Sequence, residues 1–171
     1  MVMHLANAIS YITEGEKTQD GALVGSHNCN ADTALQEMLA TKRKYGKLDK
    51  RQGYHFIISF KKQEVRPETA MEITQKFVER FLGDDFQCLY ANYDNTEHVH
   101  SHILFNSVSW RTGKKYRYEK GDWAREIRLS STNFVKNTVF PYRILKLAQK
   151  KSKRNGIKRN RVFSNGITRS A

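Results

Sequence analysis

The chain is poor in the residues that build extracellular, fibrous and membrane-spanning proteins. Its 171 residues include only two cysteines, too few for a disulfide framework, so a reduced cytoplasmic setting is expected. Two prolines and ten glycines exclude collagen-like and proline-rich classes. The sequence has no apolar run near the ~18–20 residues of a membrane-spanning helix, and the first residues lack the apolar core of a signal peptide. We therefore expect no membrane insertion.

Acidic residues are also scarce, and this imbalance is the first indication of a partner. Seventeen Asp and Glu stand against thirty Lys and Arg, which leaves a net charge of +13. A surface of that charge attracts polyanions, and nucleic acid is the commonest large polyanion. A basic protein with no such partner, or a nucleic-acid binder that does no chemistry, would have the same charge.

The basic residues concentrate toward the C-terminal end. Residues 143–169 contain ten Lys and Arg and no acid, which is typical of a solvated basic tail. The remaining chain is long enough for one domain, and a hydrophobic content of 39% excludes a wholly disordered protein. We expect one folded domain over 1–140 and a basic, flexible tail over 141–171.

Apolar periodicity predicts helices and strands in irregular alternation. Apolar residues at helical spacing predict the first helix, and Thr33 with Gln36 resembles a capping box that opens the second. Compact runs with β-branched and aromatic residues predict strands. The expected helices cover 4–14, 33–44, 67–82 and 122–136, the expected strands cover 55–60, 86–93, 98–110 and 115–118, and a loop is expected up to residue 30. Short turns between neighbouring strands favour an α+β fold, with an antiparallel β-sheet flanked by helices.

One of these strands carries three of the six histidines at alternate positions. Because side chains alternate between the faces of a strand, His98, His100 and His102 share one face, whereas Val99 and Ile103 share the other. Neighbouring imidazoles on one face can share a divalent ion, which a His-rich but solvent-facing strand would not do. A structural zinc site is less favoured, because the cysteines are distant in sequence and lack paired spacing.

A metal ion beside a basic surface suits the chemistry of phosphodiesters, since it offsets charge on phosphoryl oxygens. The nucleophile would be water in a hydrolytic nuclease or a tyrosine in a strand transferase. Tyr11 is the tyrosine we select, because it lies at the edge of the apolar stripe of the first helix, where its hydroxyl can face outward. A boundary tyrosine with no catalytic role would have the same spacing.

These patterns together resemble a known family. The run His98-Val-His-Ser-His-Ile-Leu-Phe-Asn106, followed by Gly113-Lys-Lys-Tyr116, is similar to the motif of HUH endonucleases. It most resembles the MobP-class relaxases of conjugative plasmids and integrative elements in Gram-positive bacteria. The run from His4 through Tyr11 to Thr18 is similar to that family's first motif, in which a helix carries the nucleophilic tyrosine. The resemblance covers about residues 4 to 123.

The resemblance implies an enzyme of the bacterial cytoplasm that nicks one strand at an origin of transfer and reseals it. It implies that Tyr11 attacks the scissile phosphate and keeps the 5′ end attached. It also implies a divalent metal ion, such as Mn or Mg, held by His98, His100 and His102. Ser59 is expected to touch DNA near the cut, and accessory transfer proteins are a further candidate class of partner.

The segment before the histidines contains two acidic residues, and it differs from the family at one position. Asp94 and Glu97 are candidates to orient a ligand histidine or to help deprotonate Tyr11, although a solvated turn would carry the same acids. Relaxases of this kind have a further histidine where this chain has Asn92, a poor metal ligand. Either His98 or one of the acids then completes the site, or the affinity for metal is reduced. A strand that the family has before the tyrosine helix is also not evident, which predicts an unpaired sheet edge.

Contacts with DNA are expected from basic clusters, which displace counterions from the phosphates. Aromatic residues interleaved with Lys and Arg after the His-rich strand could stack on bases of single-stranded DNA, or could simply cover the sheet. The candidate DNA-binding residues, besides Ser59, are Lys42, Arg43, Lys44, Lys114, Lys115, Arg117 and Tyr118.

Two other functions would also account for these sequence features. Rolling-circle replication initiators and related transposases of the HUH class place the tyrosine after the His motif, which would select Tyr116, Tyr118 or Tyr142. A DNA-binding module that has lost catalysis would keep the basic surface without forming a covalent product.

Overall fold

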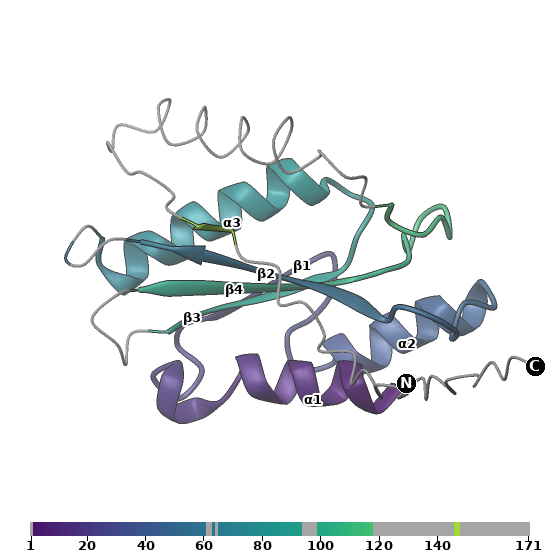
Figure 1. Cartoon of the computed structure of the whole chain (residues 1–171), viewed down its shortest axis with the longest axis horizontal. Coiled ribbons are helices and arrows are strands. Elements are labelled where there is room, and N and C mark those ends of the chain that lie inside the picture. The colour runs from purple at the N-terminus through teal and green to yellow at the C-terminus, as the bar shows by residue number, and fades with distance from the viewer. Residues whose placement is uncertain (1, 61–62, 64, 94–98, 118–145, 148–171) are drawn as a thin grey trace, which may run out of the picture.

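A five-stranded antiparallel sheet lies at the centre of the protein, with strand order β1-β3-β4-β2-β5. Helices α1 and α2 cover one face and α3 covers the other (Figure 1). The computed structural model describes residues 2–60, 63, 65–93, 99–117 and 146–147. This architecture confirms the α+β class and the antiparallel sheet flanked by helices.

Three elements were not predicted: a 3₁₀ helix, a short strand before residue 30 and a two-residue strand near the C-terminal end. The helices are α1 (Val2–Ile12), the 3₁₀ helix η1 (Gly15–Lys17), α2 (Ala34–Lys44) and α3 (Pro67–Leu82). The strands are β1 (Val24–His27), β2 (Gly53–Ser59), β3 (Cys88–Tyr93), β4 (His100–Asn106) and the two-residue β5 (Lys146–Leu147). Among the described residues, no helix is long and apolar enough to cross a membrane.

The face under α3 is an apolar layer. Pro67 lies in the first turn of α3, where its fixed φ suits a helix start, and the helix buries Ile73, Phe77 and Val78. The strand residues packed in the same cluster are Phe56, Ile58, Cys88, Tyr90, Ile103 and Phe105. Because these positions alternate along β2, β3 and β4, the residues between them point to the opposite face.

The opposite face combines apolar and polar side chains. Leu5 and Ile12 of α1 and Met38 of α2 pack with the strand residues Leu89 and Leu104. Two residues beyond Leu104, the buried amide of Asn106 donates hydrogen bonds to the backbone oxygen of Met38 at 3.2 Å and to Oε1 of Gln87 at 3.1 Å. Asn106, the last residue of the His-rich motif, therefore links α2 to the sheet through hydrogen bonds.

Strand β1 was expected to be loop. It is only four residues long and half-buried, and it has a glycine in its middle, so it lacks the apolar run that identifies a strand in sequence. Gly25 is required there, because a Cβ would lie 2.5 Å from the ring of Tyr90 on β3. The register is fixed by pairing with β3, Val24 opposite Ala91 and His27 opposite Cys88, which no local pattern reveals.

Several predicted boundaries also need correction. The His-rich strand ends at Asn106 rather than residue 110, and the expected strand at 115–118 is represented by a single bridge between Val108 and Lys115. Thr33 precedes α2 as expected, but its hydroxyl donates to Glu37, so Gln36 completes no capping box. The predicted helix over 122–136 lies outside the described residues.

Strand β2 lies between β4 and the two-residue β5, so it bears on both the predicted unpaired edge and the predicted tail. β5 pairs with its last two residues, Ile58 opposite Leu147 and Ser59 opposite Lys146. This pairing brings two residues of the basic C-terminal segment onto the sheet at the end where β4 begins, because Ser59 also pairs with His100.

Candidate active site

Tyr11 lies in the last turn of α1 and its side chain is 41% exposed. The helix holds it at the sheet through the buried side chains of Leu5 and Ile12. The hydroxyl of Tyr93, at the end of β3, donates a hydrogen bond to the backbone oxygen of Tyr11 at 2.5 Å. The tyrosine is thus tied to the sheet by its main chain while its phenol remains accessible.

His102 is the histidine that faces this tyrosine. Its ring centroid is 6.0 Å from that of Tyr11, edge to face, and 4.1 Å from that of Tyr93. His102 is buried. The neighbouring Tyr93 hydroxyl has a raised pKa, and burial is the main cause. The structure therefore brings together the two residues that the sequence analysis made nucleophile and metal ligand.

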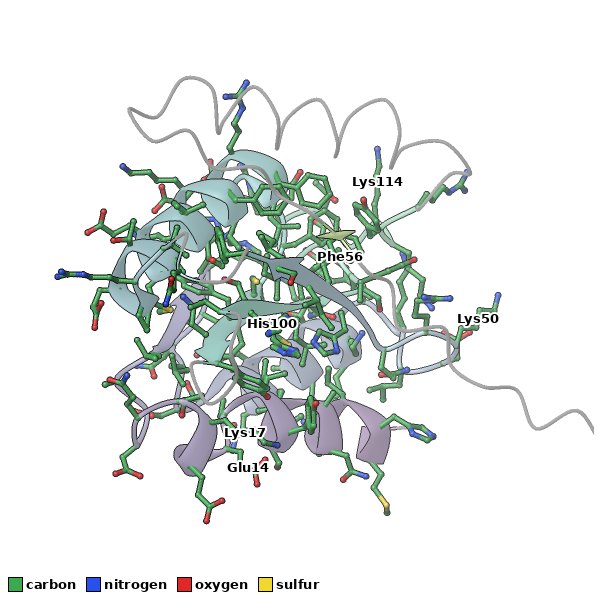
Figure 2. The ribbon with its side chains drawn as sticks, turned by 60° about the vertical axis from the view of Figure 1, so that its left-hand side comes forward. Glu14, Lys17, Lys50, Phe56, His100 and Lys114 are labelled. Carbon is green, nitrogen blue, oxygen red and sulfur yellow. The ribbon has the colours of Figure 1, made fainter. Side chains whose placement is uncertain are left out.

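His100 lies one pleat away on the same face, at the start of β4. It is half-buried and pairs across the sheet with Ser59 of β2 and Tyr93 of β3. Figure 2 shows His100 on the sheet, with Glu14 and Lys17 below it at the end of α1. Ser59, Tyr11, His100 and His102 thus share one side of the sheet, and Asp94, Glu97 and His98 lie outside the described residues.

The donor chemistry of this face fits a divalent ion. His100 and His102 present imidazoles, which bind several divalent metals. The described residues supply no group of three or more His, Cys, Asp or Glu that could hold a metal ion. The two imidazoles can therefore form part of a site, whose other positions would go to His98, water or phosphate oxygens.

Asn92 does not take part in this face. It lies on β3 opposite Ser101, and Ser101 accepts a hydrogen bond from Thr74 of α3 at 2.7 Å, so both side chains point toward α3. The buried amide of Asn92 donates to the backbone oxygen of Pro67 at 3.0 Å. The interpretation of Asn92 as a replaced ligand is corrected: Tyr93 is the residue at the end of β3 that faces the histidines.

Two residues that the sequence analysis did not select lie next to the pair, Lys17 beside Tyr11 and His55 beside His102. The ammonium of Lys17 lies 4.7 Å from the centroid of the Tyr11 ring and also forms an ion pair with Glu14. The hydrogen bond that Lys17 donates to the Glu14 carboxylate is the main cause that raises the pKa of Lys17. Nε2 of His55 lies 2.9 Å from Nδ1 of His102. His55 could be found only from the pairing of β2 with β4, because its strand contains no other histidine.

The candidate DNA-binding residues fall into two groups. Arg43, Lys44, Lys114 and Arg117 are exposed, whereas Lys115 is half-buried and paired with Asp49 at 3.2 Å. The hydrogen bond that Lys47 donates to the backbone oxygen of Gly113 brings the two basic segments side by side. Tyr118 lies outside the described residues.

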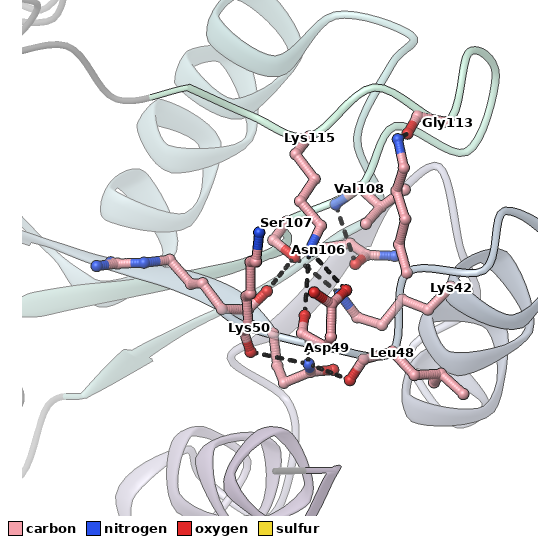
Figure 3. A network of polar contacts seen from close by, with 12 residues as sticks. Lys42, Leu48, Asp49, Lys50, Asn106, Ser107, Val108, Gly113 and Lys115 are labelled. Carbon is pink, nitrogen blue, oxygen red and sulfur yellow. Dashed lines mark hydrogen bonds and ion pairs between the residues drawn. The ribbon is translucent and has the colours of Figure 1, made fainter.

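Lys42 does not belong to this surface. Its side chain is 0% exposed and donates to Oγ of Ser107 at 2.8 Å (Figure 3). Burial, together with the neighbouring charge of Lys115, lowers the pKa of Lys42 to about 8. We therefore retain Arg43 and Lys44, and not Lys42, as candidates for contact with DNA.

Comparison with known proteins adds independent evidence. Residues 11–136 match the family described as "Relaxase: MobA/VirD2-like, nuclease domain". The chain is 38% identical over 93 residues to "Protein rlx" of Staphylococcus aureus, covering 54% of this chain and 28% of that protein. It is 29% identical over 164 residues to "Group II intron-interrupted relaxase LtrB" of Lactococcus lactis subsp. cremoris, covering 78% of this chain and 29% of that protein.

A second "Protein rlx" of Staphylococcus aureus is 33% identical over 115 residues, covering 67% of this chain and 35% of that protein. The chain thus spans about a third or less of the length of these relatives. No solved structure matches the chain.

Proposed function

The chain belongs to the MobA/VirD2-like relaxase nuclease family, and on that premise we propose that it nicks and rejoins one DNA strand through a phosphotyrosine on Tyr11. The family implies a DNA-nicking enzyme. The observation that carries the finer proposal is the packing of the Tyr11 ring against His102, with centroids 6.0 Å apart. A nucleophile on a helix and a ligand on a strand meet there at an accessible edge of the domain.

The proposed reaction is a balanced transesterification. Oη of Tyr11 forms a bond to the scissile phosphorus while the bond from that phosphorus to the 3′ oxygen breaks. The phenol loses its proton, and the departing 3′ oxygen takes up a proton to become a hydroxyl. Because the phosphodiester energy is kept in the phosphotyrosine, attack by a 3′ hydroxyl reverses the reaction and rejoins the strand.

His100 and His102 would hold a divalent metal ion, with His98 as the third candidate ligand. When bound, such an ion offsets negative charge on the phosphate that Tyr11 attacks. The protein's own part is to fix the two imidazoles on a buried strand, so that the phosphate is received beside the phenol. Mn²⁺ and Mg²⁺ are the ions we would supply first.

Other residues near Tyr11 have roles within the same proposal. Lys17 places a positive charge beside the ring that would carry the phosphate, and Ser59 lies opposite His100 where the strand would pass. Asp94 and Glu97, which precede His98 in sequence, are the candidates to orient a ligand or to accept the phenolic proton.

The proposed substrate is single-stranded DNA at the origin of transfer of a plasmid or conjugative element. The exposed cations Arg43, Lys44, Lys114 and Arg117 would bind its phosphates, and the basic segment after residue 140 would add sequence-independent affinity. Accessory transfer proteins and a bacterial cytoplasmic location belong to this proposal.

A covalent-adduct assay tests it. The protein is mixed with Mn²⁺ and single-stranded oligonucleotides that tile the origin of transfer of the element encoding it, and a denaturing gel reveals any protein–DNA adduct. We expect an adduct with the wild type and none with Tyr11→Phe, whereas Tyr116→Phe, Tyr118→Phe and Tyr142→Phe retain it. An adduct that survives Tyr11→Phe and disappears with one of the other three changes would favour the rolling-circle class. DNA binding with no adduct would indicate a non-catalytic module.

A further inference from the structure

His55 is a histidine of the site that neither the His-rich motif nor the proposed reaction uses. It lies on β2 and is half-buried. In the ladder between β2 and β4, Ser59 pairs with His100, Ile57 with His102 and His55 with Leu104. Cross-strand partners point to the same face of a sheet, so His55 shares the face of His100 and His102.

The register places His102 between the other two histidines. His100 lies one pleat to one side of it along β4, and His55 lies one pleat to the other side on β2. Nδ1 of His102 faces Nε2 of His55 at 2.9 Å, which is the length of a hydrogen bond between two ring nitrogens. An ion shared by His100 and His102 would therefore lie on the side of His102 away from His55.

A neutral imidazole has one nitrogen that donates and one that accepts. In a contact between Nδ1 of His102 and Nε2 of His55, one of the two must carry the hydrogen. If Nδ1 of His102 donates, its Nε2 has the lone pair that a metal ion requires. The ring nitrogen opposite a metal commonly donates to a fixed acceptor, which sets the tautomer and the orientation of the ring.

We propose that His55 is a positioning residue whose Nε2 accepts a hydrogen bond from Nδ1 of His102, so that His102 offers Nε2 to a divalent metal ion. This inference rests on the proposed function for the identity of the metal ligand. The packing of Tyr93 against His102, with ring centroids 4.1 Å apart, holds the ring from a second side. His102 is thereby fixed by one polar and one aromatic neighbour, each from a different strand.

Two substitutions separate this role from a merely structural one. His55→Gln keeps an acceptor, because the amide oxygen of Gln reaches about as far as Nε2 of His. His55→Leu keeps bulk and removes the acceptor. His4→Gln, at an exposed position of α1, is the matched control for losing an imidazole elsewhere. Circular dichroism and thermal melting establish that each variant is folded.

The first readout is the tautomer of His102 in metal-free protein, measured by long-range ¹H–¹⁵N NMR. We expect the Nδ1–H tautomer in the wild type and in His55→Gln, and a shift toward a tautomer mixture in His55→Leu. The second is the affinity for Mn²⁺, measured by calorimetry without DNA. We expect Kd to rise about 10–100-fold in His55→Leu, and to stay within about threefold of wild type in His55→Gln and His4→Gln.

Three results would overturn the proposal: an Nε2–H tautomer of His102 in the wild type, a Kd for Mn²⁺ that His55→Leu leaves unchanged, or His55→Gln weakening binding as much as His55→Leu. The last result would make His55 a direct ligand. If His55→Leu does not fold, the wild-type tautomer and the His55→Gln affinity still decide. Neither readout uses DNA, so a failure of the tyrosine mechanism would appear only in the adduct assay.

Discussion

The two faces of the sheet differ in what their side chains do. Under α3, the alternate residues of β4 are Ser101, Ile103 and Phe105, which serve packing and one buried hydrogen bond to Thr74. Under α1, the intervening residues begin with His100 and His102 and become apolar only at Leu104. One face of β4 thus packs in the core under α3, while the other face carries the histidines of the candidate site.

The contrast shows how a site can be both buried and accessible. On the α3 face, Ile73, Phe77 and Val78 pack against the strands. The α1 face is closed at Leu5 and Met38 and is accessible toward the end of α1, where Tyr11 is exposed. Both faces thus contribute to the core, and the candidates Tyr11, His100 and His102 lie on the α1 face.

The largest expected effect is on the packed side. Phe105→Ala should lower the free energy of unfolding by about 3–5 kcal/mol, because it leaves a cavity among aromatic neighbours. Denaturant titration measures the loss, and the milder Phe105→Leu serves as a control. At a temperature where the variant is folded, adduct formation per folded molecule should be close to that of wild type. A parallel loss of activity in the folded fraction would show that the two faces are not separable.

The next largest effect is expected on the face that carries His100 and His102. Replacing both His100 and His102 by Ala should reduce adduct formation about 100-fold or more, since the metal would lose two of its proposed ligands. Thermal melting should move far less than for Phe105→Ala, and His4→Gln should change neither property. Undiminished adduct formation by the double variant would remove the metal from the mechanism.

A smaller effect concerns the buried ammonium between α2 and the turn after β4. The pKa of Lys42 is lowered from 10.5 to about 8, so the unfolded chain binds more protons than the folded one between those values. The free energy of unfolding should therefore rise from pH 8 to pH 10.5, by about 1–3 kcal/mol more than in Lys42→Met. Denaturant titrations of both proteins across this range measure the difference. If the free energies of unfolding of the wild type and of Lys42→Met changed in parallel with pH, Lys42 would ionise in the folded protein as it does in water.

The smallest effect is expected at the surface. Changing Arg43 and Lys44 together to Gln should weaken binding of single-stranded DNA and reduce the slope of log K against log salt by about 0.7 for each lost phosphate contact. Lys76→Gln, exposed on α3, should leave the slope unchanged. Fluorescence anisotropy at several salt concentrations measures this. If Lys76→Gln reduced the slope as much as the double change at Arg43 and Lys44, DNA would have no preference for the α1 face over the α3 face.

The main elements, and the positions of Tyr11 and His102 on one side of the sheet, could be predicted because they depend on local pattern. The alternation of His100 and His102 with Ser101 and Ile103 shows the two faces of β4, and the apolar spacing of the first helix brings Tyr11 to its edge. Both signals are carried within a few residues of sequence.

The remainder depends on contacts between distant segments. β1 is stabilised by its pairing with β3 and by the fit of Gly25 under Tyr90, neither of which has a local signature. His55 is identified only by its register with β4, and the burial of Lys42 only by the approach of Ser107. Asn92 was misplaced because face assignment on β3 requires its pairing with Ser101.

The hydroxyl of Tyr93 has a mechanical consequence for the proposed enzyme. A DNA strand attached to Tyr11 would pull on the main chain at the last turn of α1, where a helix has no further turn to bond its carbonyls. The bond from Tyr93 to the Tyr11 carbonyl transfers part of that tension to β3, which is held by β1 and β4 on its two sides. Part of any force on the DNA would therefore be carried by the middle of the sheet, and the helix end would bear less of it.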